Sequence, residues 1–221
     1  PLQHRVGNGY VYSSQFISED QARAELLANL NGEMLTEPRL IRFATGMRRD
    51  FWHKNCVAFG LSSGFLEPLE STSISLIQTG INKLAAFLVN FEINDRQVAE
   101  ANRLNRLEYE RIRDFIILHY KLNGRTEPLW QAVRAMDIPP SLAEKIAFFT
   151  AEGRVKLFEQ ESFMEESWVS MFAGFGLDPV NLQSLSDPGK ILSVMDKMRA
   201  AIRKGCALAP SHADFLHTLN D

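Results

Sequence analysis

The residues best suited to chemistry lie in one segment, residues 56–73, which reads CVAFGLSSGFLEPLESTS. The segment predicts a short strand, a loop with two glycines, and then the start of a helix. Glycines let the backbone approach a ligand closely, and the first amides of a helix have no partner inside it. Those amides, with the helix dipole, form a ready anion site.

Acidic and hydroxyl side chains surround this predicted helix start: Glu67 and Glu70 come first, followed by Ser71, Thr72 and Ser73. Residues of these types before an apolar stripe most often cap the helix, so capping is the simpler interpretation from residue types alone. The histidines show no metal-ligand spacing, and we expect no metal site. The three tryptophans are expected to pack in the interior.

The elements before Gly64 are expected to mix strands and a helix. Strands are predicted at residues 10–17, 39–44 and 56–59 from their β-branched and aromatic content. Ser18 to Gln21 form a capping box that opens a helix, which Gly32 is expected to end.

After Gly64 the prediction is almost wholly helical. A first long helix follows from apolar residues that recur every three or four positions. A second is predicted over residues 95–121, with further helices around Trp130, from a capping box at residues 141–144, over residues 165–172, and from Asp187-Pro188 to Gly205. The stripe expected to face inward on the first helix is Ile74, Ile77, Ile81, Leu84, Leu88 and Phe91.

The whole pattern predicts an α+β fold that is predominantly α-helical. We expect a boundary near residues 90–95, which divides the chain into a mixed α/β part, residues 1–92, and a helical lobe, residues 93–221. A chain of 221 residues is long enough to bury a substantial core.

Composition narrows the class of protein. The content of 45% hydrophobic and 23% charged residues is ordinary for a folded soluble protein, and a net charge of -3 makes nucleic acid a poor partner. No apolar run reaches the roughly 18 residues of a membrane span, and no signal peptide is recognised. Two cysteines cannot build a disulfide framework, so we expect reduced thiols and a cytoplasmic protein.

Two long stretches resemble flavin-dependent tryptophan halogenases. Residues 51–72 read FWHKNCVAFGLSSGFLEPLEST and closely resemble the signature of that family, and residues 1–14 (PLQHRVGNGYVYSS) match a second segment. Asp214-Phe215 also looks like the closing segment of the family. The likeness spans the chain, but it is sharp only over residues 1–17 and 43–78.

The resemblance implies a fold and a reaction. The fold is the C-terminal part of a flavin-monooxygenase-like protein, with an FAD box and a helical substrate lobe. Enzymes of the family use FADH2, oxygen and chloride or bromide to make hypohalous acid, which halogenates an electron-rich ring at a separate site. Glu70 is then the catalytic and substrate-binding glutamate, which orients the halogenating species and accepts the departing proton.

Other residues acquire roles from the same resemblance. Thr72 and Ser73 are expected to bind chloride through backbone amides. Leu61, Ser71 and Ile74 are expected to bind the flavin cofactor. Many tryptophan-specific members carry glycine where Ser73 stands, but an amide does the binding and serine supplies one equally well unless φ must be positive.

The resemblance predicts the substrate and the partners in less detail than the reaction. Members that grip free tryptophan present paired tyrosines near residues 165–172, which read EESWVSMF here. Tryptophan and an indole-like ring are therefore both expected substrates. The resemblance also implies a separate flavin reductase, and a homodimer is compatible with it.

Pro1 in place of an initiator methionine suggests a fragment. In the family, the main FAD-binding motif and the catalytic lysine precede the matched region, so we expect this chain alone to be inactive. Two alternatives stay open: a related flavin monooxygenase that hydroxylates an aromatic ring, and a non-catalytic helical interaction module in which Glu67 and Glu70 merely cap a helix.

Overall fold

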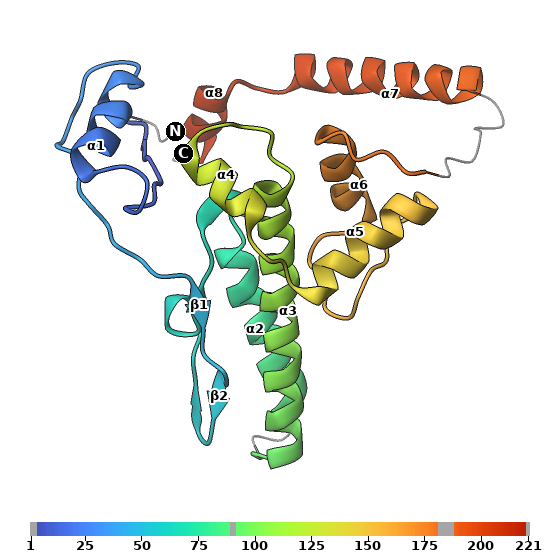
Figure 1. The fold of residues 1–221 in the computed structure, drawn as a ribbon. Helices are drawn as coiled ribbons and strands as arrows, with labels where there is room; N and C mark the ends of the chain where they lie inside the picture. The colour runs from blue at the N-terminus through green and yellow to red at the C-terminus, as the bar shows by residue number, and fades with distance from the viewer. Residues whose placement is uncertain (1–3, 89–91, 181–187, 220–221) are drawn as a thin grey trace. The chain divides into compact units, whose positions relative to one another are not determined.

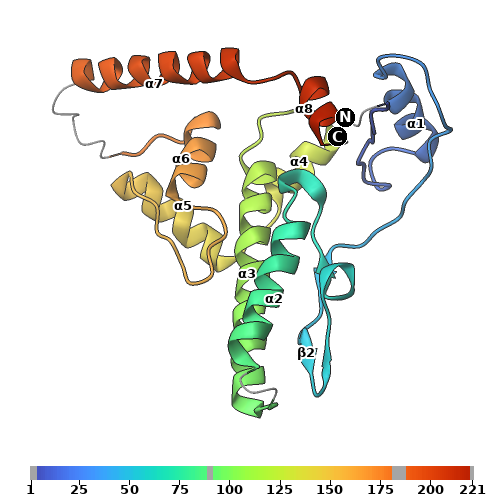
Figure 2. The same cartoon turned by 180° about the vertical axis from the view of Figure 1, so that it is seen from behind.

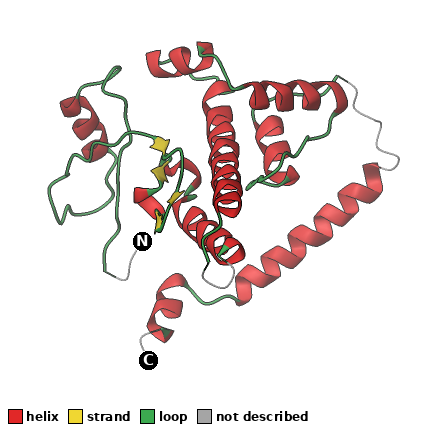
Figure 3. Cartoon of the chain, turned by 90° about the horizontal axis from the view of Figure 1, so that it is seen from below, coloured by secondary structure: helices red, strands yellow, loops and turns green. Residues whose placement is uncertain are grey.

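The computed structural model describes residues 4–88, 92–180 and 188–219. The chain forms two compact units, one of residues 39–182 and one of residues 1–38 with 183–221. Helices make up most of both units and strands are few (Figure 3). The prediction of a predominantly helical α+β fold is confirmed.

The larger unit is built around one long helix. Helix α3 (Asp95–Lys121) lies side by side with α2 (Ser73–Phe87) in Figures 1 and 2. The Asn94 side chain begins α3 by accepting hydrogen bonds from the amides of Arg96 and Gln97. Three shorter helices also contact α3: α4 (Pro128–Ala135), α5 (Pro140–Glu152) and α6 (Glu165–Gly174).

Buried apolar side chains join these helices in three clusters among the described residues. The first lies between α3, α5 and α6, the second between α2 and α3, and the third between residues 51–52 and α3. Their buried members are Phe115, Leu118, Leu142, Phe149, Trp168 and Phe172; then Leu76, Tyr109, Ile112 and Ile116; and then Phe51, Trp52 and Ala101.

The strands are two-residue pairs that shape the turns before α2. Strand β1 (Gly46–Met47) pairs antiparallel with β4 (Gly64–Phe65), and β2 (Trp52–His53) pairs with β3 (Cys56–Val57). Short 3-10 helices η1 (Gly60–Ser62) and η2 (Pro68–Glu70) complete the segment.

The side chain of Asn102, on α3, forms hydrogen bonds with both backbone polar groups of Trp52. The Asn102 carboxamide accepts from the Trp52 amide at 2.9 Å and donates to the Trp52 carbonyl at 2.8 Å, and it is buried. The Asn102→Leu substitution leaves both backbone groups unpaired, so we expect the free energy of unfolding to fall by about 2 kcal/mol in urea denaturation. If Asn102→Leu unfolds like the native chain, these bonds contribute nothing.

The smaller unit contains three helices among its described residues: α1 (Glu19–Ala28), α7 (Pro188–Leu208) and α8 (His212–Thr218). The predicted capping box of α1 is confirmed, because Ser18 and Gln21 exchange side-chain and backbone hydrogen bonds. Cys206 on α7, and Cys56 in the larger unit, are free and exposed thiols.

Several predicted strands and helix ends are wrong. Residues 10–17 and 39–44 form no strand in the described structure, because neither run has a neighbouring strand to pair with. Helix α1 ends at Ala28, before Gly32, and Gly205 lies inside α7 and does not end it. Asp187, the predicted start of that last helix, lies outside the described residues.

The capping box predicted at residues 141–144 is also wrong. Helix α5 begins at Pro140, whose fixed φ suits the first turn, and the Ser141 hydroxyl donates to the Asp114 carboxylate on α3. The bounds of α3 and the helix around Trp130 agree with prediction.

The buried face of α2 differs from the predicted stripe. Leu76, Gly80 and Lys83 are buried, whereas Ile74 and Ile81 are exposed. The division near residues 90–95 stays a prediction, and α2 and α3 on either side of it pack within one unit. No helix of the described residues is both long and apolar enough to cross a membrane.

Candidate active site at the start of helix α2

Backbone contacts hold the glycine-containing loop in place. The Arg48 amide donates to the Ser63 carbonyl at 2.7 Å, and the Arg48 side chain donates to the Ser62 carbonyl at 2.5 Å. A Cβ at Gly64 would lie 2.8 Å from the Gly46 carbonyl oxygen, so only glycine fits this pairing. The close approach that this glycine permits is therefore to its own chain, within β1 and β4.

The turn into α2 contains an uncommon backbone conformation. Ser71 has φ 52° and ψ 35°, the left-handed region that residues other than glycine rarely adopt. Its amide donates to the Pro68 carbonyl at 3.0 Å, which closes η2. Such conformations cluster at functional sites, because the surrounding structure must hold them. The turn separates Glu70 from the first residues of α2.

Glu70 points to α3, where it meets a histidine. The Glu70 carboxylate lies 2.7 Å from His119 Nε2, and the two side chains are 27% and 16% exposed. Glu70 is thus partly accessible and not a helix cap: α2 begins after Thr72 with no side-chain capping bond. No group of three or more potential metal ligands occurs among the described residues.

Glu67 is held by the next residue of α3. The Tyr120 hydroxyl donates to Glu67 Oε1, and the Tyr120 ring stacks on Trp130. Burial, followed by this carboxylate, raises the pKa of the Tyr120 phenol. Glu67 stands at the N-cap position of η2, but its carboxylate makes no capping hydrogen bond. The prediction that Glu67 and Glu70 cap the helix is therefore wrong, and both carboxylates contact side chains near the end of α3.

Tyr120→Phe removes the bond to Glu67, and we expect a loss of about 1 kcal/mol of stability at neutral pH. Because the folded pKa of Tyr120 is raised, this contribution is complete below the ordinary tyrosine pKa of about 10 and is lost as the pH rises through the folded pKa. Urea denaturation of both proteins should show a gap that narrows above pH about 10. Tyr10→Phe, at an exposed tyrosine, is the control. A gap that stays constant at alkaline pH would contradict this role.

The other predicted site residues surround the same turn. Thr72 precedes α2 and Ser73 begins it, so their amides lie at the helix end that carries partial positive charge. Leu61 in η1 and Ile74 in α2 are 78% and 79% exposed, and η1 contacts α2. Exposed apolar side chains beside a polar turn suit an apolar ligand or a further protein segment.

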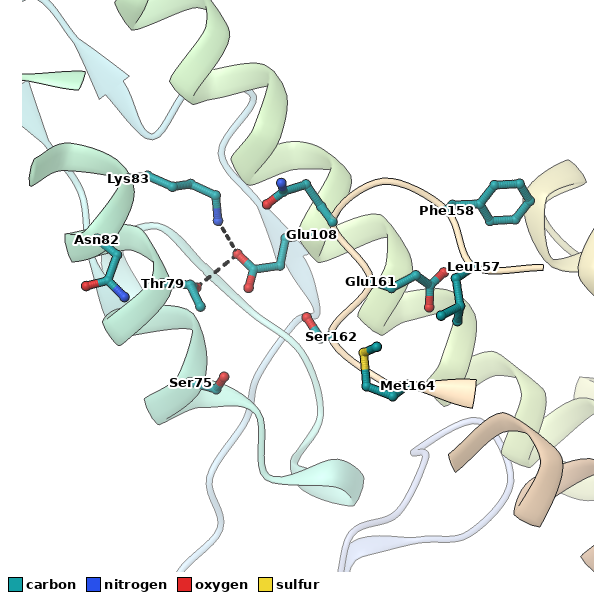
Figure 4. Close-up of a pocket in the computed structure, with 11 residues that line it drawn as sticks. Ser75, Thr79, Asn82, Lys83, Glu108, Leu157, Phe158, Glu161, Ser162 and Met164 are labelled. Carbon is teal, nitrogen blue, oxygen red and sulfur yellow. Dashed lines mark hydrogen bonds and ion pairs between the residues drawn. The ribbon is translucent and has the colours of Figure 1, made fainter. Parts of the chain in front are cut away.

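A cavity of about 650 Å³ lies between α2, α3 and residues 157–164. Figure 4 shows Lys83 and Thr79 of α2 directed at Glu108 of α3, with Leu157 and Met164 on the other side. Lys83 Nζ donates to Glu108, and Thr79 donates to the same oxygen at 2.9 Å. The nearly buried ion pair gives this cavity a polar wall.

Sequence reasoning missed Lys83 and Glu108. Lys83 lies four residues after Thr79, and therefore on the same face of α2, but that face was not predicted to be buried. Tyr120 and His119 were missed as partners of Glu67 and Glu70 because the contacts join distant segments. No local pattern identifies such pairs.

Comparison with known proteins finds similarity to tryptophan halogenases. The family model for tryptophan halogenase matches residues 1–188. RebH, a tryptophan 7-halogenase from Lentzea aerocolonigenes, is 33% identical over an alignment that covers 81% of this chain and 37% of RebH. ThaL, a tryptophan 6-halogenase from Streptomyces albogriseolus, is 31% identical over 100% of this chain and 45% of ThaL.

Solved structures show the same likeness. BrvH, a flavin-dependent halogenase from Brevundimonas sp. BAL3, is 48% identical with a TM-score of 0.89, over 99% of this chain and 45% of BrvH. The chain thus spans less than half the length of each of these three proteins.

Proposed function

We propose that this chain, which belongs to the tryptophan halogenase family, supplies the catalytic glutamate and the halide-binding amides of a flavin-dependent aromatic halogenase. Because it spans less than half the length of its relatives, we assign the activity to a longer polypeptide that carries it. The rest of that polypeptide is expected to provide the main FAD-binding motif and the catalytic lysine. The reaction, cofactor and substrate are proposals for that whole protein.

The observation that carries the proposal is the arrangement at the start of α2. A partly exposed carboxylate, Glu70, lies 2.7 Å from His119 Nε2 and directly precedes the turn into a helix whose first amides have no side-chain cap. Halogenation of a ring needs these two functions, a place for halide and an acceptor for the proton that leaves. Helix amides favour an anion, and a carboxylate favours a proton.

The residues of the chain also fit a flavin. Leu61 and Ile74 expose apolar surface on elements that are in contact, which suits the face of an apolar ring system. Ser71 follows Glu70 in the turn before α2 and is assigned to the flavin-binding part of the same proposed site. Reduced FAD with oxygen, when bound, would supply the oxidation of halide to hypohalous acid.

Each residue then has a defined task. The amides of Thr72 and Ser73 bind chloride or bromide. Glu70 orients the hypohalous acid against the substrate ring and accepts the proton displaced from the halogenated carbon. The substrate is an electron-rich aromatic, tryptophan or an indole-like ring, and a separate flavin reductase supplies FADH2 in the cytoplasm. A homodimer is compatible with this assignment.

The experiment that tests the function uses the longer polypeptide with a flavin reductase, FAD, NADH, oxygen and chloride or bromide. Tryptophan and indole are supplied separately, and products are measured by mass spectrometry. The proposal predicts a product with the isotope pattern of one added halogen. A hydroxylated product would assign the protein to flavin monooxygenases, and no product from a broad set of aromatic rings would overturn the chemistry.

A further inference from the structure

The contact between His119 and Glu70 joins two segments that lie far apart in the sequence. His119 occupies the last turn of α3, where a positive side chain is favoured by the helix dipole. Its Nε2 lies 2.7 Å from Glu70 Oε1. The adjacent Tyr120 holds Glu67. Two neighbouring residues of α3 thus fix both ends of the turn that presents Glu70.

The hydrogen-bond partners of His119 determine which ring nitrogen faces Glu70. Nδ1 lies 2.8 Å from the backbone carbonyl oxygen of Phe115, which only accepts hydrogen bonds. An ionised Glu70 carboxylate also only accepts. Nε2 is therefore the ring nitrogen that donates to Glu70 Oε1, while Nδ1 is directed at the backbone of its own helix. The Phe115 ring, edge-on to His119 with centroids 5.1 Å apart, further fixes the imidazole.

We propose that His119 is a positioning residue that commits one oxygen of Glu70 and leaves the other to act on the substrate. This inference rests on the proposed function. Oε1 lies 2.7 Å from His119 Nε2, and the Glu70 side chain is 27% exposed, which leaves the carboxylate accessible to a ligand. In the reaction, the C–H bond at the halogenated carbon breaks, its electron pair restores the aromatic ring, and the proton passes to Oε2. His119 does not touch the substrate and acts through Glu70.

Two amide substitutions separate the two hydrogen bonds of His119. Glutamine places an N–H donor near the position of Nε2, whereas asparagine places one near Nδ1. In the longer polypeptide we expect His119→Asn to lower kcat for halogenation by about 10- to 100-fold, because Glu70 loses its fixed orientation. KM for the aromatic substrate should stay close to the native value. His119→Gln should recover most of the rate, and His53→Asn, at an exposed histidine, is the matched control.

A second measurement needs neither flavin nor turnover. In protein labelled with 15N-histidine, the signal that disappears in His119→Gln reports on His119. We expect Nε2 to carry a hydrogen that is bonded to Glu70 in the native protein, and the 15N signal of Nε2 to shift in Glu70→Ala. An Nε2 signal that is the same in the native protein and in Glu70→Ala would overturn the proposed contact.

The outcomes distinguish the inference from the function on which it rests. If the native protein halogenates and His119→Asn is equally fast, His119 does not position Glu70, and the function stands. If the native protein halogenates no aromatic ring, the function fails, and the 15N spectra still decide whether His119 holds Glu70. If the asparagine variant melts early and binds no FAD, the spectra of the native and Glu70→Ala proteins decide.

Discussion

Glu70→Gln will lower kcat for aromatic halogenation by about 100-fold or more, the range in which removal of a general base falls. The substitution keeps the side-chain shape, and its amide oxygen still accepts from His119 Nε2. What it removes is the negative charge that accepts the proton displaced by halogen. The measurement is the rate of product formation at saturating substrate, followed by mass spectrometry in the longer polypeptide.

Glu67→Gln is the matched control for this result. It makes the same chemical change three positions earlier, and Tyr120 still donates to the amide oxygen. Glu67 is assigned a structural role, so this variant should keep most of the native rate. A Glu70→Gln variant that turns over like the native protein, or a Glu67→Gln variant that is equally impaired, would remove the special role of Glu70.

Lys145→Met will cost about 3 to 5 kcal/mol of stability, the penalty for leaving a buried charge without its partner. Lys145 Nζ lies 2.6 Å from Glu161 Oε1, and the two side chains are 1% and 5% exposed. The ammonium also lies 4.1 Å from the centroid of the Trp168 ring. Burial lowers the pKa of Lys145, and Glu161 opposes that shift. We expect the melting temperature to fall by about 10 °C.

Two further variants test the cause of this loss. Lys145→Met combined with Glu161→Gln removes both charges and keeps an acceptor for the Trp168 indole, so it should recover part of the melting temperature. Lys156→Met breaks the exposed pair with Glu144 and should change little. If Lys145→Met and Lys156→Met melt alike, burial does not make the Lys145–Glu161 pair important.

The features predicted correctly from the sequence are those that depend on residues close together in the chain. The bounds of α3 follow from Asn94 and from a long periodic stripe, and the Ser18 capping box is a contact between residues three positions apart. The buried face of α2 could not be predicted in the same way. Ile74 and Ile81 have the right spacing for a core, yet α2 turns Leu76 and Lys83 toward α3. Periodicity identifies a helix but not which neighbour covers it.

The candidate site shows the same limit. Residue types at the start of α2 allowed an anion site, but favoured a cap, and only the resemblance of residues 51–72 to a family assigned Glu70 a catalytic role. The pairing of Glu67 with Tyr120 spans 53 residues, and that of Trp52 with Asn102 spans 50. Such contacts depend on the packing of the loop against α3. That packing is a property of the folded chain and not of any local pattern.

We propose that the start of α2 is the halide-binding end of a halogenase active site. The most direct test is crystallographic: crystals of the longer polypeptide with FAD are soaked in bromide, and diffraction is recorded at the bromine absorption edge. We expect an anomalous peak within hydrogen-bond distance of the Thr72 and Ser73 amides. Bound FAD with no bromide at those amides would contradict it.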